Sequence, residues 1–235
     1  MGKTILSLVD ITKTYTMGEV EVQALRETSL EVYEGEFVVI LGPSGSGKST
    51  LLNIIGGMDT PTSGELFFKD IDLSQADDAL LTKYRREEVG FVFQFYNLIS
   101  DLTALENVEL AADLVKKSTP PRDVLAQVGL ADRLDHFPAQ LSGGEQQRVS
   151  VARAIVKNPR FLLCDEPTGA LDYETSIMIL ALLKRINRET GCTVLLITHN
   201  NAIGDMADRV MRLRSGEIVE VIKNKDPLPP ERIEW

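Results

Sequence analysis

The hydrophobic positions along the chain predict an α/β fold. Short apolar runs bounded by turn residues predict buried strands, which span 37–41, 89–93, 161–164 and 193–198. Residues 173–190 instead place apolar side chains at helical spacing and end at Gly191, which predicts a long helix. Strands that alternate with helices in this way are typical of a parallel sheet covered by helices.

Further strands are predicted toward both ends of the chain, and they span 5–9, 20–25, 29–32, 65–68, 210–213 and 217–221. Turn residues at Ser215-Gly216 predict that the last two form a hairpin. The polar segment before residue 89 carries no predicted element. Between 97 and 158 the spacing becomes helical, which predicts a helical insertion.

We therefore expect one domain over residues 1–235. In this prediction, a β-rich subdomain and an α/β core together comprise segments 1–96 and 159–225. Segment 97–158 forms a helical subdomain, and the proline-rich residues 226–235 form a tail that excludes a regular helix or central strand.

Composition limits the classes of function. A net charge of −10 and a pI near 4.8 disfavour nonspecific nucleic-acid binding, which depends on basic residues. No apolar run reaches the length of a membrane-spanning helix, and the first residues lack the apolar segment of a signal peptide, so we expect a cytosolic protein. Cys164 and Cys192 border apolar runs and are predicted to be small buried side chains.

A glycine-rich segment lies between the strand at 37–41 and a helix with apolar residues at Leu51, Ile54 and Ile55. Its glycines allow the backbone N–H groups to turn onto phosphate oxygens, and the start of the helix favours an anion. Lys48 can reach the β- and γ-phosphates, Ser49 can bind Mg²⁺, and Thr50 can add a hydrogen bond to phosphate. An ordinary glycine-rich turn is the alternative. The predicted nucleotide-binding residues are Gly42, Ser44, Gly45, Ser46, Gly47, Lys48, Ser49 and Thr50.

Polar side chains follow three of the predicted strands. Asp165 and Glu166 follow 161–164, where a carboxylate could hold Mg²⁺ and a second one could activate water as a general base. Two acids at a strand end are otherwise a solvated turn. His199 follows 193–198 and could contact the γ-phosphate, although a lone histidine there is more often structural. Gln94 follows the strand at 89–93 and could reach Mg²⁺ or the water.

A second loop spans residues 141–148. Ser142 and Glu145 have the spacing of a capping box, and Gly143 and Gly144 would expose the N–H groups at the start of a helix. This pattern predicts a second anion site, against the alternative of an ordinary capped helix. If the second loop serves the nucleotide of another copy, the protein must dimerise around ATP.

The order of these motifs resembles the ATP-binding subunit of ABC transporters, and the resemblance covers essentially the whole chain. The Walker A loop matches 42–50, the Q-loop glutamine matches Gln94, the signature matches 141–148 and Walker B matches 161–165. The resemblance implies an α/β P-loop NTPase fold with a RecA-like core, an antiparallel β subdomain and an α-helical insertion subdomain.

The resemblance also assigns roles to single residues. Glu166 matches the catalytic glutamate, His199 the switch histidine and Asp172 the D-loop aspartate. Tyr15 matches the aromatic residue that stacks on adenine, although a half-buried strand aromatic is the alternative. Glu145 stands where many members carry glutamine.

The family mechanism implies ATP and Mg²⁺ as cofactors and a homodimer that encloses two ATP molecules. The expected partner is a separate transmembrane permease, with no nucleic acid, so the subunit would be cytoplasmic and peripheral on the inner face of the cell membrane. Segments 60–64, 90–98 and 102–108 resemble the branch of lipoprotein-release, macrolide-export, antimicrobial-peptide-resistance and cell-division ATPases.

Several alternatives follow from this interpretation. Phe95, Tyr96 and Leu98 could form an apolar socket for a permease helix, or belong to the core. The ATPase could drive export or extraction of a lipoprotein, peptide or drug-like substrate. It could instead act as a mechanical regulator of an extracellular protein without transport. Acidic charge disfavours a soluble ATPase of translation or repair, and the loop at 141–148 disfavours a small-molecule kinase.

Overall fold

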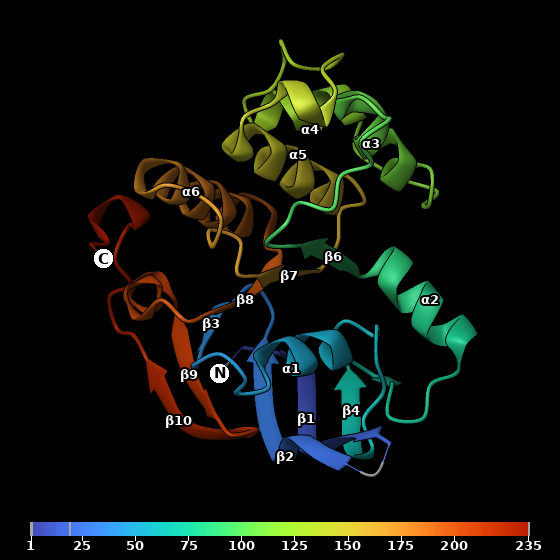
Figure 1. Cartoon of the computed structure of the whole chain (residues 1–235), viewed down its shortest axis with the longest axis vertical. Helices are drawn as coiled ribbons and strands as arrows, with labels where there is room; N and C mark the ends of the chain where they lie inside the picture. The colour runs from blue at the N-terminus through green and yellow to red at the C-terminus, as the bar shows by residue number, and fades with distance from the viewer. Residues whose placement is uncertain (1, 19, 235) are drawn as a thin grey trace. The chain divides into compact units, whose positions relative to one another are not determined.

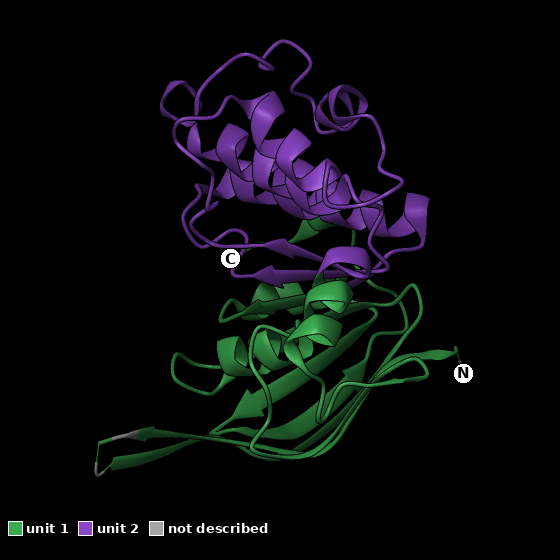
Figure 2. Cartoon of the chain, turned by 90° about the vertical axis from the view of Figure 1, so that its right-hand side faces the viewer, with its two compact units in different colours: residues 1–85, 195–235 green, residues 86–194 purple. Residues whose placement is uncertain are grey.

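Strands dominate both ends of the chain and helices dominate its middle, as the sequence predicts (Figure 1). The computed structural model describes residues 2–18 and 20–234, so the predicted domain ends at 1 and 235 lie outside the described residues. The chain divides into unit 1, from residues 1–85 and 195–235, and unit 2, from residues 86–194 (Figure 2). The mixed α/β class is confirmed.

An antiparallel sheet forms one part of unit 1. Its strands follow the order β2-β1-β4-β5 and comprise β1 (Thr4–Met17), β2 (Val20–Tyr33), β4 (Ser63–Phe68) and β5 (Ile71–Asp72). Pairs such as Leu8 with Leu30 and Leu8 with Leu66 place buried leucines in register across β2, β1 and β4. These cross-strand apolar pairs stabilise the sheet.

The prediction of separate strands at 20–25 and 29–32 is wrong, because β2 is continuous. Glu27 has a φ of 44° and Asp10 on β1 a φ of 49°, and the register of the two strands shifts between Leu8 and Thr14. Bulges of this kind let a strand continue through polar residues that otherwise indicate a turn. For the same reason β1 extends well beyond the predicted 5–9.

A second set of strands in unit 1 follows the order β10-β9-β3-β8. These are β3 (Phe37–Leu41), β8 (Thr193–Thr198), which begins in unit 2, β9 (Arg209–Arg214) and β10 (Glu217–Lys223). β9 and β10 form the predicted hairpin, and β9 pairs with β3 in parallel. Every residue of β3 and β8 is buried, which explains why β3 is apolar throughout and β8 is apolar between its terminal Thr193 and Thr198.

Two helices accompany these strands. Helix α1 (Lys48–Ile55) follows β3, as predicted, and Gly56 is its C-cap. Helix α2 (Asp78–Glu87) lies mostly in unit 1 and in the segment where the sequence predicts no element. Only Leu81 and Tyr84 of α2 are buried, so its apolar stripe is too sparse to detect. Short 3₁₀ turns at Asn201–Met206 and Pro230–Arg232 complete the unit.

Unit 2 contains the parallel pair β6 (Val89–Val92) and β7 (Phe161–Asp165), and most of the helical residues. Helix α6 has the predicted bounds and ends at Gly191, whose φ of 70° suits glycine. The helices are α3 (Ala104–Ala112), α4 (Pro121–Gln127), α5 (Gly143–Ile155) and α6 (Tyr173–Thr190), with a 3₁₀ turn at Pro138–Gln140.

Cys164 and Cys192 are buried, as predicted, and burial raises the pKa of both thiols. Raised pKa values keep them as unreactive thiols. Across residues 2–18 and 20–234, every helix is too short or too polar to cross a bilayer.

Candidate functional site

The predicted phosphate loop connects β3 to α1. Its first N–H, at Gly42, donates to the Thr198 carbonyl at the end of β8 over 3.3 Å. The loop therefore starts at a fixed point where two buried strands end side by side. Further along, Gly45 and Gly47 adopt φ values of 76° and 100°, at which other L-residues are strained.

Close packing explains two of the loop glycines. A Cβ at Gly42 would lie 2.4 Å from the Leu213 carbonyl oxygen, and one at Gly47 would lie 2.5 Å from the Ala24 carbonyl oxygen. At Gly45, by contrast, a Cβ would meet nothing within 4 Å among the described residues. The loop therefore packs closely against its neighbours at Gly42 and Gly47 and is open at Gly45, as an anion-binding loop requires.

Lys48 lies over this loop. Its Nζ donates to the carbonyl oxygens of Gly42 and Pro43 at 2.8 and 3.1 Å, and the residue is 7% exposed. Among the described residues, no side chain caps α1 at Gly47, and the first turn contains no acid. The ammonium and the helix start therefore suit phosphate oxygens.

The loop serines differ in exposure. Ser44 and Ser49 are exposed, whereas Ser46 is 3% exposed and its Oγ has no hydrogen-bond partner among the described residues. An exposed hydroxyl on the first turn of α1 suits a metal that arrives with a nucleotide. The Ser44 and Ser46 contacts to nucleotide stay predictions.

Tyr15 lies near Thr50 and is hydrogen-bonded to Asp59. The Tyr15 hydroxyl donates to Asp59 Oδ2 at 2.7 Å. Burial raises the pKa of Tyr15 and the bond to Asp59 raises it further, whereas the nearby Thr50 side chain lowers it. Tyr15 is a half-buried strand residue, and its stacking on adenine stays a prediction, as does the bond from Thr50 to phosphate.

His199 follows β8 and is exposed. The preceding Thr198 accepts the Gly42 N–H at its carbonyl and the Asn200 N–H at its Oγ1, the latter at 3.1 Å. Unit 1 thus brings the backbone before His199 to the start of the phosphate loop. This placement suits the predicted contact with a terminal phosphate.

In unit 2, the predicted acids lie at the end of the buried strand β7. Asp165 and Glu166 are both half-buried, and Glu166 has a φ of 44°. A non-glycine residue in this region costs roughly 1 kcal/mol or more, and such residues cluster at active sites. A Cβ on Gly169 would lie 2.9 Å from Gln94 Nε2, so the Gln94 amide rests against the turn that follows Glu166.

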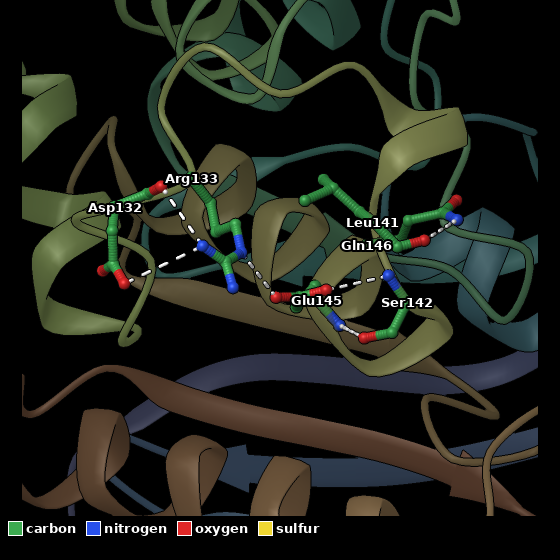
Figure 3. Close-up of polar contacts among 6 residues, drawn as sticks. All are labelled: Asp132, Arg133, Leu141, Ser142, Glu145 and Gln146. Atoms are coloured by element: carbon green, nitrogen blue, oxygen red, sulfur yellow. Dashed lines mark hydrogen bonds and ion pairs between the residues drawn. The ribbon is translucent and has the colours of Figure 1, made fainter.

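The second predicted loop begins α5 with the expected capping box (Figure 3). The Glu145 N–H donates to Ser142 Oγ at 3.3 Å, and the Ser142 N–H donates to Glu145 Oε2 at 2.8 Å. Gln146 Nε2 adds a bond to the Leu141 carbonyl at 3.1 Å. Together these bonds fix the conformation of the loop.

Arg133 pairs with the glutamate of this loop (Figure 3). Its Nε lies 3.0 Å from Glu145 Oε1, while Asp132 lies farther away, with Oδ2 3.8 Å from Arg133 Nη1. The hydrogen bond from the Ser142 backbone lowers the pKa of Glu145, and Arg133 lowers it further. Glu145 is therefore ionised at neutral pH, with its charge balanced by an arginine that the sequence analysis missed.

The glycines of the second loop also allow close packing inside unit 2. A Cβ at Gly143 would lie 2.9 Å from the Tyr96 hydroxyl oxygen, and one at Gly144 would lie 2.4 Å from Thr175 Cγ2. Thr175 donates its N–H and hydroxyl to Asp172 Oδ1 and Oδ2, at 2.9 and 2.7 Å. Asp172 is thus the N-cap of α6, and an aspartate directly before a helix is a typical sequence signal for this role.

The predicted Mg²⁺ ligands can be compared with the side chains that the site offers. Among the described residues, no three His, Cys, Asp or Glu side chains converge on a metal site. Magnesium in nucleotide sites takes one or two protein oxygens, with phosphates and water completing its shell. Ser49, Gln94 and Asp165 fit that chemistry, and their role as ligands stays a prediction.

Comparison with known proteins identifies relatives along most of the chain. The family described as ABC transporter matches residues 25–169, more than half of the chain. The lipoprotein-releasing system ATP-binding protein LolD of Geobacter metallireducens is 46% identical over 221 residues, covering 92% of this chain and 98% of that protein. The macrolide export ATP-binding/permease protein MacB of Salmonella choleraesuis is 44% identical over 220 residues, covering 92% of this chain but 34% of that protein.

A solved structure shares the fold. It is the dimeric post-hydrolysis state of the ATP-binding cassette MJ0796 of Methanocaldococcus jannaschii, bound to ADP and Pi. It matches with a TM-score of 0.87 at 45% identity, covering 94% of this chain and 99% of that chain. This likeness confirms the predicted P-loop NTPase fold class.

Proposed function

The chain belongs to the ABC transporter family of ATP-binding proteins, and from this premise we propose that it is the ATPase subunit of a transporter whose permease is a separate membrane protein. The family establishes the ATPase activity. The observation that carries the permease proposal is Phe95, a large apolar side chain that is 73% exposed. We infer a cytoplasmic location at the inner face of the membrane through that permease.

The proposed chemistry assigns one role to each site residue. Lys48 binds the β- and γ-phosphates, and the N–H groups in the first turn of α1 stabilise their negative charge. Glu166 takes a proton from the attacking water, and His199 orients the γ-phosphate and that water. When bound, Mg²⁺ neutralises phosphate charge. Its proposed ligands are Ser49, Gln94 and Asp165.

We propose that the remaining contacts come from a second copy. Ser142, Gly143 and Gly144 of one subunit would face the ATP bound by the other, and Asp172 would transmit the state of one site to the other. The ordered capping box of α5 supports this role, since its loop is already fixed before any ligand binds. The related cassette MJ0796 is described as dimeric.

The Arg133–Glu145 pair gives a test of this second site. Arg133→Gln should raise the ATP concentration needed for dimer formation by roughly three- to tenfold, because an unbalanced carboxylate near the start of α5 repels phosphate. Glu145→Gln in the same chain should restore dimer formation, as measured by sedimentation. Arg122→Gln, at an exposed position of the same unit, serves as the control. A double variant as weak as Arg133→Gln would refute the charge argument.

The turn that presents Phe95 is fixed rather than loose. The next residues, Tyr96 and Asn97, have φ values of 58° and 50°. Arg153 of α5 donates to both of their carbonyl oxygens, at 2.8 and 2.6 Å. Exposure excludes the core alternative for Phe95, and a rigid exposed aromatic is typical of an interface anchor.

The permease proposal predicts that Phe95→Ala weakens the permease complex by at least about 30-fold, the loss of an interface anchor worth about 2 kcal/mol. The measurement is recovery of the tagged chain with its solubilised native permease, together with the ATP affinity of the isolated chain, which should not change. Met178→Ala, at another exposed apolar position of unit 2, is the matched control. Recovery with ribosomes or DNA instead of a membrane protein would overturn the proposal.

By likeness to LolD and MacB, we propose a lipoprotein, peptide or drug-like molecule as the transported substrate. Transport assays in vesicles that contain the complex would test this class. ATP-dependent signalling without movement of any of these substrates would favour the mechanical regulator.

A further inference from the structure

Tyr15 lies in a network of charged and polar contacts that the family motifs do not include. Asp59 accepts the Tyr15 hydroxyl at Oδ2 over 2.7 Å and the Lys13 ammonium at Oδ1 over 2.6 Å. Lys13 also donates to the Thr60 carbonyl at 2.7 Å, and its Nζ lies 5.0 Å from the centre of the Tyr15 ring. The hydroxyl and one ring face of Tyr15 are therefore both in contact with this network.

The network connects Tyr15 to the helix that begins in the phosphate loop. Asp59 follows α1, and its N–H donates to the Asn53 carbonyl in that helix at 3.2 Å. Thr50, in the first turn of α1, lies close enough to the same tyrosine to lower its pKa. The ring is thus tied through Asp59 to the C-terminal part of the helix whose start receives phosphate, so base and phosphate contacts share one rigid element.

Burial makes the ion pair persistent. The side chains of Lys13 and Asp59 are 12% and 26% exposed, so water competes weakly with their bond. Burial alone would raise the pKa of Asp59, but the hydrogen bonds from Lys13 and Tyr15 hold the pKa below its ordinary value. The carboxylate is therefore charged at neutral pH and remains an acceptor for the tyrosine hydroxyl.

We propose that Asp59 and Lys13 are positioning residues that hold the Tyr15 ring ready for the base of the nucleotide. Asp59 anchors the hydroxyl end of the ring, and Lys13 covers one face, which leaves the other face for the base. A ring that is already fixed loses little rotamer freedom when the base stacks on it. The inference rests on the proposed role of Tyr15 in stacking.

Affinities for ATP and for inorganic tripolyphosphate, each with Mg²⁺, separate base contacts from phosphate contacts. Tyr15→Ala should weaken ATP binding by about 5- to 100-fold, the range for loss of base stacking. Tyr15→Phe and Asp59→Ala should each weaken ATP binding by about two- to tenfold, the range for one hydrogen bond. The double variant of Tyr15→Phe and Asp59→Ala should bind ATP only slightly more weakly than either single variant, because both substitutions remove the same hydrogen bond. Tripolyphosphate affinity should not change in any variant.

Tyr33→Phe is the matched control, since its hydroxyl donates to Glu31 Oε2 at 3.0 Å in the same sheet. If Tyr15→Ala weakens ATP binding while Tyr15→Phe and Asp59→Ala bind as the unchanged chain does, stacking stands and the positioning proposal fails. If Tyr15→Ala also binds ATP normally, the stacking role itself is wrong. Equal losses for ATP and tripolyphosphate in Asp59→Ala would show damage to the phosphate loop and would overturn the proposal.

Discussion

Glu166→Gln is expected to slow ATP hydrolysis by a factor on the order of 10² to 10⁴, the usual contribution of a general base. The amide cannot take a proton from water, yet it has the shape of the carboxylate and tolerates the same φ of 44°. ATP affinity should therefore remain. Because the nucleotide is no longer consumed, the ATP-bound dimer should accumulate, which size-exclusion chromatography with ATP measures alongside phosphate release.

The matched control is Glu189→Gln, an exposed glutamate on α6 of the same unit, which should hydrolyse ATP at the unchanged rate. Hydrolysis by Glu166→Gln at the rate of the unchanged chain would remove Glu166 as the base. Loss of ATP binding together with turnover would show instead that the amide distorts the turn between Glu166 and Gly169, whose N–H donates to the Glu166 carbonyl at 2.9 Å.

Elements with one strong local signal were predicted well. β3 and β8 are buried along their whole length, so their apolar runs have no ambiguity. α6 combines a regular apolar stripe with a glycine that ends it. By contrast, β2 passes through a bulge at Glu27, and α2 buries only two residues. Packing against neighbouring elements decides the secondary structure of such segments, and the local sequence pattern does not show that packing.

The residues of the candidate site also divide into those that the sequence predicted and those that it did not. The motifs identify residues that act through their own type and spacing, such as Lys48 and Ser142. They do not identify the residues that position Tyr15 or the turn after Phe95, because those residues lie far away in the sequence: Asp59 is 44 residues from Tyr15, and Arg153 is 57 residues from Tyr96. Hydrogen bonds between such positions follow from the tertiary fold, so only the structure shows them.

Lys48→Ala is expected to weaken ATP binding by roughly 10- to 1,000-fold, since hydrogen bonds to charged groups contribute about 1.5 to 3 kcal/mol each. The unliganded fold should tolerate the change. The Lys48 ammonium donates to the loop carbonyls of Gly42 and Pro43 at 2.8 and 3.1 Å, and Pro43 is exposed to water that can replace the ammonium there. Lys48→Ala should therefore lower the affinity for ATP and leave the stability of the unliganded fold nearly unchanged.

Thermal unfolding with and without ATP measures both quantities. At an ATP concentration 100 times the Kd of the unchanged chain, binding stabilises the fold by about 2.7 kcal/mol. A 100-fold weaker Kd reduces this to about 0.4 kcal/mol at the same concentration. Lys83→Ala, an exposed lysine on α2, should keep the full effect of ATP. If Lys48→Ala is stabilised by ATP as strongly as Lys83→Ala, the loop between β3 and α1 does not bind the phosphates through its lysine, and the helix start alone must supply the binding energy.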